Sequence, residues 1–129
     1  MCIRRRIYYH HTDAGGVVYY ANYLHFFEES RTELFRQKGI DLKELSAQGV
    51  MFVVCRQEVD YRHPAFYADE LKIETIVAKA QGVRIEFAHN VVNQKGEAIC
   101  SARTVMACVS SELRPKPIPE DIKSKLVEL

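Results

Sequence analysis

The sequence has no excess of charge of either sign. Its 18 lysine and arginine residues face 17 aspartate and glutamate residues, which gives a formal net charge of +1 over 129 residues. Proteins that bind nucleic acid through bulk charge neutralise many phosphates at once, so this balance excludes that class. The Arg4-Arg5-Arg6 run is therefore interpreted as a solvated strand face, and any anion-binding site must be local.

Long apolar runs are also missing. No stretch approaches the roughly 20 apolar residues that a membrane-spanning helix needs. The first residues, Met1 to Arg6, carry no apolar signal-peptide core and continue into an alternating segment. The sequence therefore predicts a cytoplasmic protein without a transmembrane segment.

No two of the four cysteines form a Cys-x-x-Cys pair. Three of the four lie inside apolar, strand-like runs, which favours buried, reduced thiols over two disulfide bonds. The four are Cys2, Cys55, Cys100 and Cys108.

Recognised motifs for several chemistries are absent. The chain has no Gly-x-Ser-x-Gly, no P-loop, no Gly-x-Gly-x-x-Gly and no His-Glu-x-x-His. His10 and His11 are expected to point to opposite sides of a strand end, which is poor for chelation. His89 shares the apolar face of its strand and is interpreted as structural. We therefore expect neither a metal site nor a cofactor.

Apolar spacing predicts one long helix over residues 21–38, with Gly39 as its stop. Asn22 is a candidate N-cap, and a start one or two residues earlier fits the sequence equally well. Its apolar positions are Leu24, Phe27, Leu34 and Phe35. A capping box at residues 41–44 begins a second, short helix that Gly49 ends.

Period-two patterns predict strands elsewhere in the chain, at 3–9, 50–62, 71–79, 83–91 and 98–109, and Pro119 can begin a terminal helix. Strands grouped after a helix are typical of an α+β fold with an antiparallel sheet of about five strands. We expect a single domain over residues 1–129. Such a sheet is roughly 20 Å wide, whereas one helix covers about 10–12 Å. The sheet must curl around the helix, or leave apolar surface for a partner, or both.

The segment before the long helix carries the clearest chemical signal. Asp13 lies on a loop with Gly15 and Gly16, close to the helix start, where unpaired N–H groups and the positive end of the helix dipole lie. This pairing suits acyl transfer, in which amides polarise a carbonyl while a carboxylate attacks it or activates water. Alternatively, Asp13 is only an Asx-turn residue that precedes the glycines.

Residues 8–31 read YYHHTDAGGVVYYANYLHFFEESR. This segment resembles the signature of the 4-hydroxybenzoyl-CoA thioesterase family of hot-dog-fold proteins. It is most similar to the branch of bacterial acyl-CoA thioesterases associated with the Tol–Pal envelope system. The resemblance continues in residues 59–70, VDYRHPAFYADE, and in residues 115–119, PKPIP.

The resemblance implies roles for particular residues. Asp13 would be the catalytic carboxylate, either as nucleophile or as general base, and a backbone amide at or near Tyr20 would polarise the thioester carbonyl. Tyr9 would shape the site, and Gly16 and Val17 would contact the substrate. One departure is that the related branch has His at the position of Tyr20, which is a poor base because an unperturbed tyrosine has a pKa of about 10. A second is that this branch has an acid where His11 stands.

The resemblance also implies a long helix wrapped by an antiparallel sheet, and a homodimer or homotetramer. Coenzyme A would lie along a subunit interface, and its phosphates would meet Arg62, His63 and Arg56, each of which is equally consistent with a solvated strand edge. The expected activity is hydrolysis of an acyl-CoA thioester. Alternatives are a hydratase or dehydratase on the same fold, and a non-catalytic acyl-CoA-binding protein.

Overall fold

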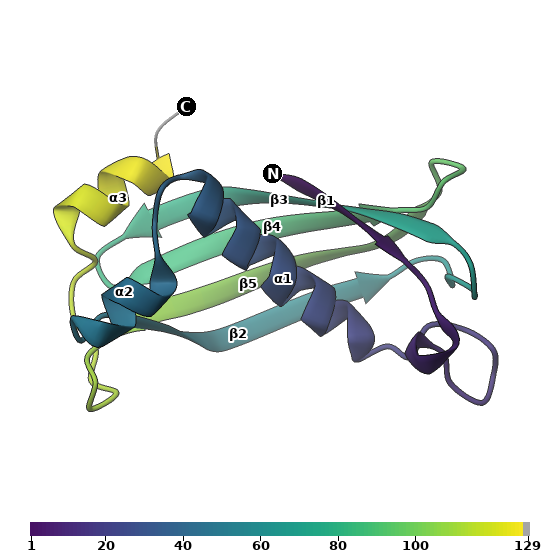
Figure 1. The fold of residues 1–129 in the computed structure, drawn as a ribbon, viewed down its shortest axis with the longest axis horizontal. Helices are drawn as coiled ribbons and strands as arrows, with labels where there is room; N and C mark the ends of the chain where they lie inside the picture. Colours follow the sequence, from purple (N-terminus) through teal and green to yellow (C-terminus); the bar gives the residue numbers. More distant parts are fainter. Residues whose placement is uncertain (128–129) are drawn as a thin grey trace.

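The computed structural model describes residues 1–127. Five strands form one sheet in the order β1-β3-β4-β5-β2, and every neighbouring pair is antiparallel (Figure 1). The strands are β1 (Cys2–Arg6), β2 (Met51–Tyr61), β3 (Glu70–Gln81), β4 (Arg84–Val92) and β5 (Ala98–Val109). The helices are the 3₁₀ turn η1 (Tyr9–His11), α1 (Asn22–Gln37), α2 (Leu42–Ala47) and α3 (Glu120–Val127).

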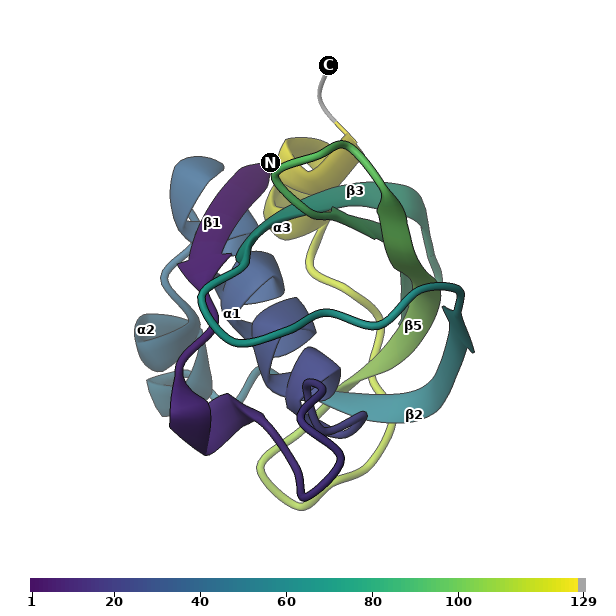
Figure 2. The ribbon, with the colours of Figure 1, turned by 90° about the vertical axis from the view of Figure 1, so that its right-hand side faces the viewer.

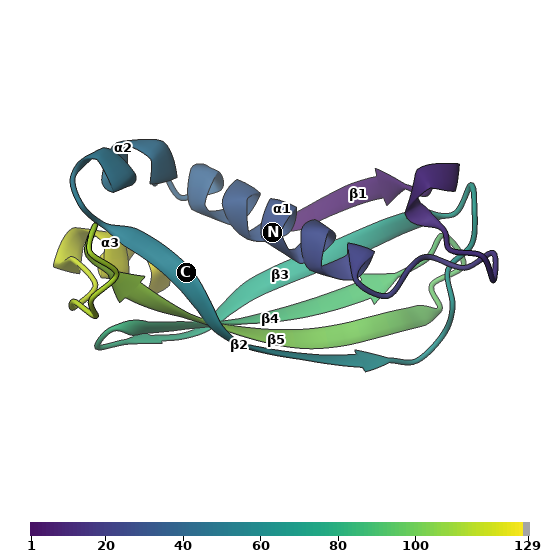
Figure 3. The same ribbon diagram turned by 90° about the horizontal axis from the view of Figure 1, so that it is seen from below.

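The sheet curves around α1, which confirms the predicted α+β hot-dog architecture (Figure 2). Seen from below, α2 and α3 lie at one end of the molecule, and η1 and the loop before α1 lie at the other (Figure 3). Among residues 1–127, no helix combines the length and apolar character needed to cross a bilayer.

The buried face of α1 divides the core into two clusters. Toward the start of the helix, Phe27 packs with Ile73 of β3 and Val91 of β4. Toward its end, Phe35 packs with Phe87 of β4. The helical spacing correctly predicted Phe27, Leu34 and Phe35 as core residues, but Leu24 is 40% exposed. The prediction for Leu24 was wrong because this residue lies at the margin of the buried face of α1.

Two local predictions at the N-terminal end of the sheet were also wrong, namely the end of the first strand and the orientation of the adjacent histidines, whereas the start of α1 one residue earlier is one that the sequence allowed. The first strand ends at Arg6, and η1 brings the His10 and His11 ring centroids to 4.0 Å instead of pointing them apart. The N-cap of α1 is Ala21 and makes no side-chain capping bond. Asn22 instead donates through Nδ2 to the His11 carbonyl oxygen at 2.7 Å.

The predicted cap of α2 is confirmed, because the Asp41 side chain accepts hydrogen bonds from the N–H groups of Lys43 and Glu44. All four cysteines are free thiols. Burial raises the pKa of Cys100 to about 12 and also raises that of Cys108. Cys55 is exposed, contrary to prediction, because the pairing of β2 with β5 shifts register between Val54 and Arg56 and places Cys55 in a β-bulge.

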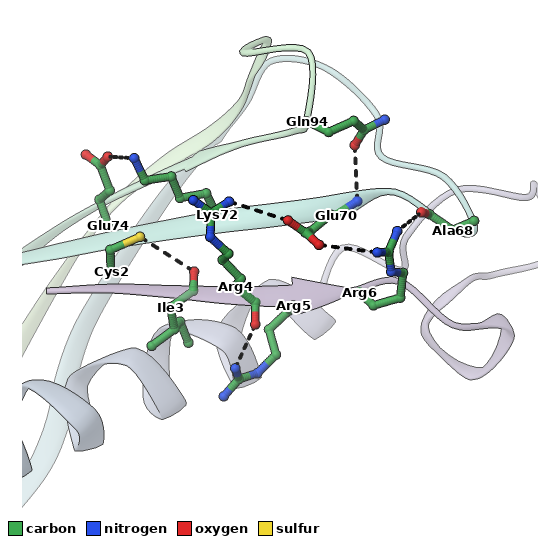
Figure 4. A network of polar contacts seen from close by, with 10 residues as sticks. All are labelled: Cys2, Ile3, Arg4, Arg5, Arg6, Ala68, Glu70, Lys72, Glu74 and Gln94. Atoms are coloured by element: carbon green, nitrogen blue, oxygen red, sulfur yellow. Dashed lines mark hydrogen bonds and ion pairs between the residues drawn. The ribbon is translucent and has the colours of Figure 1, made fainter.

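The arginine run of β1 is engaged in local ion pairs (Figure 4). Arg4 and Arg6 both contact the Glu70 carboxylate of β3, at 3.4 and 3.2 Å, and Arg5 contacts Glu29 of α1 at 2.8 Å. These charges therefore bind the edge strand β1 to its neighbours.

Candidate active site

The loop between η1 and α1 is a short hairpin. The Asp13 N–H donates to the Val17 carbonyl oxygen at 2.9 Å, and the Tyr19 N–H donates to the His11 carbonyl oxygen at 2.9 Å. Gly16 lies at its tip with φ +81°, a conformation in which residues with a Cβ are strained. The hairpin brings Asp13 and the residues before α1 to the same end of the molecule.

The Asp13 side chain is exposed, and one of its two carboxylate oxygens accepts a hydrogen bond. Its Oδ1 accepts a hydrogen bond from the Gly15 N–H at 2.8 Å, which is the contact of an Asx turn. Its Oδ2 makes no hydrogen bond within residues 1–127. The two interpretations of Asp13 are therefore compatible, because one oxygen fixes the carboxylate and the other remains available for chemistry.

The start of α1 offers unused donors beside this loop. The Asn22 N–H donates to the Tyr19 carbonyl oxygen at 2.9 Å. In the described part of the chain, the N–H groups of Tyr20 and Ala21 donate to no acceptor. They lie at the positive end of the helix dipole, where a developing negative charge is stabilised.

Two tyrosines link Asp13 to these donors. The pKa of Tyr19 is raised, first by its hydrogen bond and charge interaction with Tyr20, and also by the nearby Asp13 carboxylate. The two tyrosine rings lie 4.9 Å apart between centroids. Tyr19 is therefore close both to the Asp13 carboxylate and to Tyr20, the residue that stands where the related branch has histidine.

The two sequence motifs meet at this hairpin. Val17 forms a β-bridge with Phe66, and the Val18 N–H donates to the Ala65 carbonyl oxygen at 2.9 Å. The Tyr9 ring stacks on Tyr67, with centroids 3.9 Å apart and planes within 5°. Residues that are distant in sequence thus form one surface around Asp13.

Comparison with known proteins identifies the family. Residues 9–126 match the Thioesterase-like superfamily. The chain belongs to that superfamily. It is 36% identical over 118 residues to the acyl-CoA thioester hydrolase YbgC of Escherichia coli O157:H7, covering 91% of this chain and 88% of the relative. It is 38% identical over 122 residues to the acyl-CoA thioesterase YbgC of Haemophilus influenzae, covering 92% and 88%.

Solved structures show the same fold. A probable thioesterase from Bartonella henselae superposes with a TM-score of 0.85 at 31% identity, covering 92% of this chain and 98% of that one. A hypothetical protein from Aquifex aeolicus superposes with a TM-score of 0.91 at 27% identity, covering 98% of each chain. The family resemblance of residues 8–31 is thereby confirmed.

The structure separates the three basic residues that the thioesterase resemblance suggested for coenzyme A. Arg62 and His63 follow β2 at the same end as the hairpin. The Arg62 Nη2 contacts the Ser101 Oγ at 3.3 Å, and the His63 Nε2 contacts the Glu97 Oε2 at 3.1 Å. Arg56 lies six residues earlier on β2, about 20 Å along the strand, and is paired with Glu58. Arg56 is therefore not brought together with the other two.

His11 lies under the hairpin. Its Nδ1 accepts from the Tyr8 N–H at 2.9 Å, which leaves the proton of the neutral ring on Nε2. Its pKa is lowered, first by burial and then by His10, against an opposing effect of Glu29. In the described residues, no group of three or more His, Cys, Asp or Glu side chains could hold a metal ion.

Sequence reasoning quoted Tyr61 and Tyr67 within a thioesterase motif but gave them no role. Tyr67 stacks on Tyr9, and the Tyr61 hydroxyl donates to the Tyr20 carbonyl oxygen at 3.0 Å. The alternation of side chains along β2 could have identified Tyr61. It lies two residues after Val59 and therefore on the same face of the strand, the face toward α1.

A buried chain of hydrogen bonds in the core was also missed. The Thr75 hydroxyl contacts the His89 Nδ1 at 2.7 Å, and the His89 Nε2 contacts the Thr104 hydroxyl at 3.1 Å. The Ser30 hydroxyl extends the chain to α1, and Gln57 extends it to β2. His89 is 1% exposed, which confirms that it is structural, and burial lowers its pKa to about 3, with Arg31 adding to the effect.

Proposed function

We propose that the protein hydrolyses an acyl-CoA thioester to a carboxylic acid and free coenzyme A. The observation that carries this proposal is the position of the Asp13 carboxylate beside the start of α1. Its Oδ2 accepts no hydrogen bond in the described residues, and the N–H groups of Tyr20 and Ala21 donate none there. The YbgC relatives, named as acyl-CoA thioester hydrolases, support the same activity.

In the general-base route, the thioester carbonyl oxygen lies against the N–H groups of Tyr20 and Ala21. Asp13 takes a proton from water, and the hydroxide oxygen bonds to the carbonyl carbon. The resulting oxyanion is stabilised by the two amides. When it collapses, the carbon–sulfur bond breaks and the thiolate of coenzyme A leaves, recovering the proton from Asp13.

In the nucleophilic route, a carboxylate oxygen of Asp13 itself bonds to the carbonyl carbon. The thiolate leaves, and water then hydrolyses the mixed anhydride to regenerate Asp13. Both routes need an ionised Asp13 and the same amides. The Tyr20 contribution in either route is its backbone amide, while Tyr9, Gly16 and Val17 shape the surface around the thioester.

In this proposal, the phosphates of coenzyme A lie near Arg62 and His63. The arginine can bind a phosphate through two parallel N–H groups, which gives a local anion site in a nearly neutral protein. Arg56 is a weaker candidate because its guanidinium is paired with Glu58 and lies far along β2.

The active species is proposed to be a homodimer or homotetramer. β2 is an edge strand of 11 residues, and Val54 on it is 49% exposed. A long edge with exposed apolar side chains is a template for pairing with another chain. A second copy of this chain would cover the edge and close the site along a subunit interface. The four free thiols fit a reducing compartment such as the cytoplasm.

A hydratase or dehydratase would need a histidine–acid pair for proton transfer at carbon. Within residues 1–127, the one histidine–carboxylate ion pair is His63 with Glu97, whose side chains are 44% and 41% exposed. It lies outside the Asp13 hairpin, so hydrolysis is favoured over this alternative.

The deciding experiment measures thiol release from a panel of acyl-CoA substrates beside binding of the same compounds. We expect release of coenzyme A with a saturable rate. Binding without thiol release would support the non-catalytic alternative, and formation of a hydrated acyl-CoA would support the hydratase.

A further inference from the structure

Arg31 is a buried cation to which the proposed hydrolysis assigns no role. It lies on α1 and is 6% exposed. Burial lowers its pKa, and Glu28, one helical turn earlier, only partly opposes that effect. A buried charge is costly unless it is paired and hydrogen-bonded. The surroundings of Arg31 therefore indicate whether the chain itself supplies that partner.

The described residues supply only one hydrogen-bond acceptor for the Arg31 guanidinium. The Arg31 Nη1 donates to the Thr104 Oγ1 at 3.3 Å. Its Nε and Nη2 donate to no group within residues 1–127, and no carboxylate forms an ion pair with it there. Neither nitrogen is sealed from solvent, because no fully buried side-chain nitrogen or oxygen lacks a hydrogen-bond partner in the described residues. Each unused donor therefore keeps some contact with solvent.

The Thr104 hydroxyl cannot accept more. Its one proton goes to the Gln57 Oε1 at 2.7 Å, and it accepts from both Arg31 and His89. A hydroxyl has one donor and two acceptor positions, so all are occupied. The remaining donors of Arg31 therefore need an acceptor that is not part of this network.

Arg31 lies on the side of α1 toward β2, because it shares the Thr104 hydroxyl with Gln57 of that strand. Positions 24, 31 and 35 fall on one stripe of α1. In this stripe, the Phe35 ring stacks on Phe52 of β2 with centroids 5.5 Å apart. Leu24 is 40% exposed, and Tyr61 on the facing side of β2 is 49% exposed. Apolar side chains therefore flank this side of α1 from Tyr61, beside the hairpin, to Phe52, and we call them the apolar strip.

Two distances, one estimated along β2 and one along α1, place Arg31 along this strip. Gln57, which shares Thr104 with Arg31, precedes Tyr61 by four residues, or about 13 Å along a strand. Ala21 precedes Arg31 by ten residues, or about 15 Å along a helix. An extended chain spans roughly 3.3–3.6 Å for every three backbone bonds, so these two distances correspond to about 11 to 14 bonds.

We propose that Arg31 recognises a carboxylate at the far end of the acyl chain, and that the preferred substrates are acyl-CoA thioesters of medium-chain dicarboxylic acids. The inference rests on the proposed hydrolysis. The thioester lies at the N–H groups of Tyr20 and Ala21, and the methylene chain covers the apolar strip. The distal carboxylate accepts the free Nε and Nη2 protons of Arg31, in the bidentate geometry that guanidinium favours.

The first experiment uses the wild-type protein. Dodecanedioyl-CoA is compared with dodecanoyl-CoA, and succinyl-CoA with butanoyl-CoA. We expect kcat/KM about 10–100-fold higher for dodecanedioyl-CoA than for dodecanoyl-CoA, because an unpaired buried polar group penalises the substrate that lacks its partner. The short pair should show no such preference, because the succinyl carboxylate cannot reach Arg31. Equal or lower kcat/KM for dodecanedioyl-CoA overturns the inference.

The second experiment replaces Arg31. Arg31→Met should abolish the preference for dodecanedioyl-CoA while leaving dodecanoyl-CoA hydrolysis within about threefold, and Arg31→Lys should retain part of the preference. Arg36→Met, at an exposed position on α1, is the matched control and should change neither substrate. An equal loss on both substrates in a folded Arg31→Met protein would give Arg31 a structural role only. If that variant does not fold, the wild-type comparison decides the inference alone.

The substrate inference and the proposed function fail differently. Thiol release from dodecanoyl-CoA without any preference for dodecanedioyl-CoA removes only the role of Arg31. Absence of thiol release from every acyl-CoA removes the proposed hydrolysis and the inference together.

Discussion

The Tyr61 hydroxyl donates a hydrogen bond to the Tyr20 carbonyl oxygen at 3.0 Å, and so joins the last residue of β2 to the start of α1. The peptide unit between Tyr20 and Ala21 is planar and trans, so the Ala21 N–H points away from that carbonyl. The contact therefore fixes the direction of an amide that is proposed to polarise the thioester.

Tyr61→Phe tests this arrangement. The substitution keeps the ring, which lies 5.7 Å from the Tyr23 ring, and removes only the hydroxyl. We expect kcat to fall by about three- to tenfold, because one neutral hydrogen bond contributes roughly 0.5–1.5 kcal/mol. KM should change little. Steady-state kinetics with unchanged kcat would show that the start of α1 is held well enough without this contact.

Asp13→Asn tests the catalytic carboxylate. Asparagine can still accept the Gly15 N–H, so the turn should persist and the melting temperature should stay within a few degrees. We expect kcat to fall by about 10²–10⁴-fold, the usual contribution of a positioned acid–base group. Asp41→Asn is the matched control, since it also preserves its turn role as the cap of α2 but lies far from the site. Near-normal kcat in Asp13→Asn would leave Asp13 as a turn residue only.

Arg62→Ala tests recognition of the coenzyme phosphates. We expect KM for acyl-CoA to rise about three- to thirtyfold, with little change for an acyl-pantetheine that lacks the nucleotide, because only the former carries the phosphates. Arg56→Ala, on β2 and paired with Glu58, serves as the control and should affect neither substrate. Equal losses of kcat/KM on both substrates would assign Arg62 to holding the loop after β2 through Ser101.

Stability should fall in acid because of His89. Its pKa is about 3 in the folded protein and about 6.5 when unfolded, so between these values only the unfolded chain binds the proton. Stability from this group is therefore complete above pH 6.5 and declines as the pH falls toward 3. By pH 4.5 the loss should reach roughly 2–3 kcal/mol in urea titrations. His89→Gln should be less stable at pH 7 but show a shallower decline, and an equal decline in both proteins would contradict the assignment.

The uncovered edge of β2 should determine assembly. Light scattering after size exclusion should give at least a dimer at micromolar concentration. Lysine on a strand edge opposes pairing with another chain, so Val53→Lys with Val54→Lys should yield monomers with strongly reduced activity. The same double change at the exposed Ile76 and Ala78 of β3, which β4 and β5 separate from β2, provides a surface control that should stay oligomeric. An active wild-type monomer would remove the subunit-interface site.

Much of the fold could be predicted from the spacing of apolar residues and from the glycine, proline and capping residues that end helices and strands. The helix over residues 22–37 and the strand run from Met51 onward follow from apolar spacing, since burial of one face imposes that spacing. Leu24 was mispredicted because the period defines a stripe without stating whether another element covers it. Cys55 was mispredicted because a bulge interrupts the alternation that its apolar neighbours suggested.

The site could be predicted only in part. Asp13 and the helix start were recognisable because loop, glycines and helix are adjacent in sequence. The contacts of Tyr61 with Tyr20 and of Tyr67 with Tyr9 join residues about 40 to 60 positions apart, and only the closed sheet determines which of them meet. The unpaired donors of Arg31 were invisible for the same reason, because the sequence shows a charge without showing its neighbours.

The buried hydrogen-bond chain through His89 has a direction. The Thr104 proton goes to Gln57, so the His89 Nε2 must donate to Thr104, its Nδ1 must accept from Thr75, and Thr75 must accept from Ser30. The three hydroxyls and the neutral His89 ring each have one proton to donate. Replacing any one of these four groups therefore leaves a hydrogen-bond donor or acceptor in the core without a partner. These positions should consequently vary as a set among descendants of this sequence, and a lineage that loses one of the hydroxyls should have rebuilt the others.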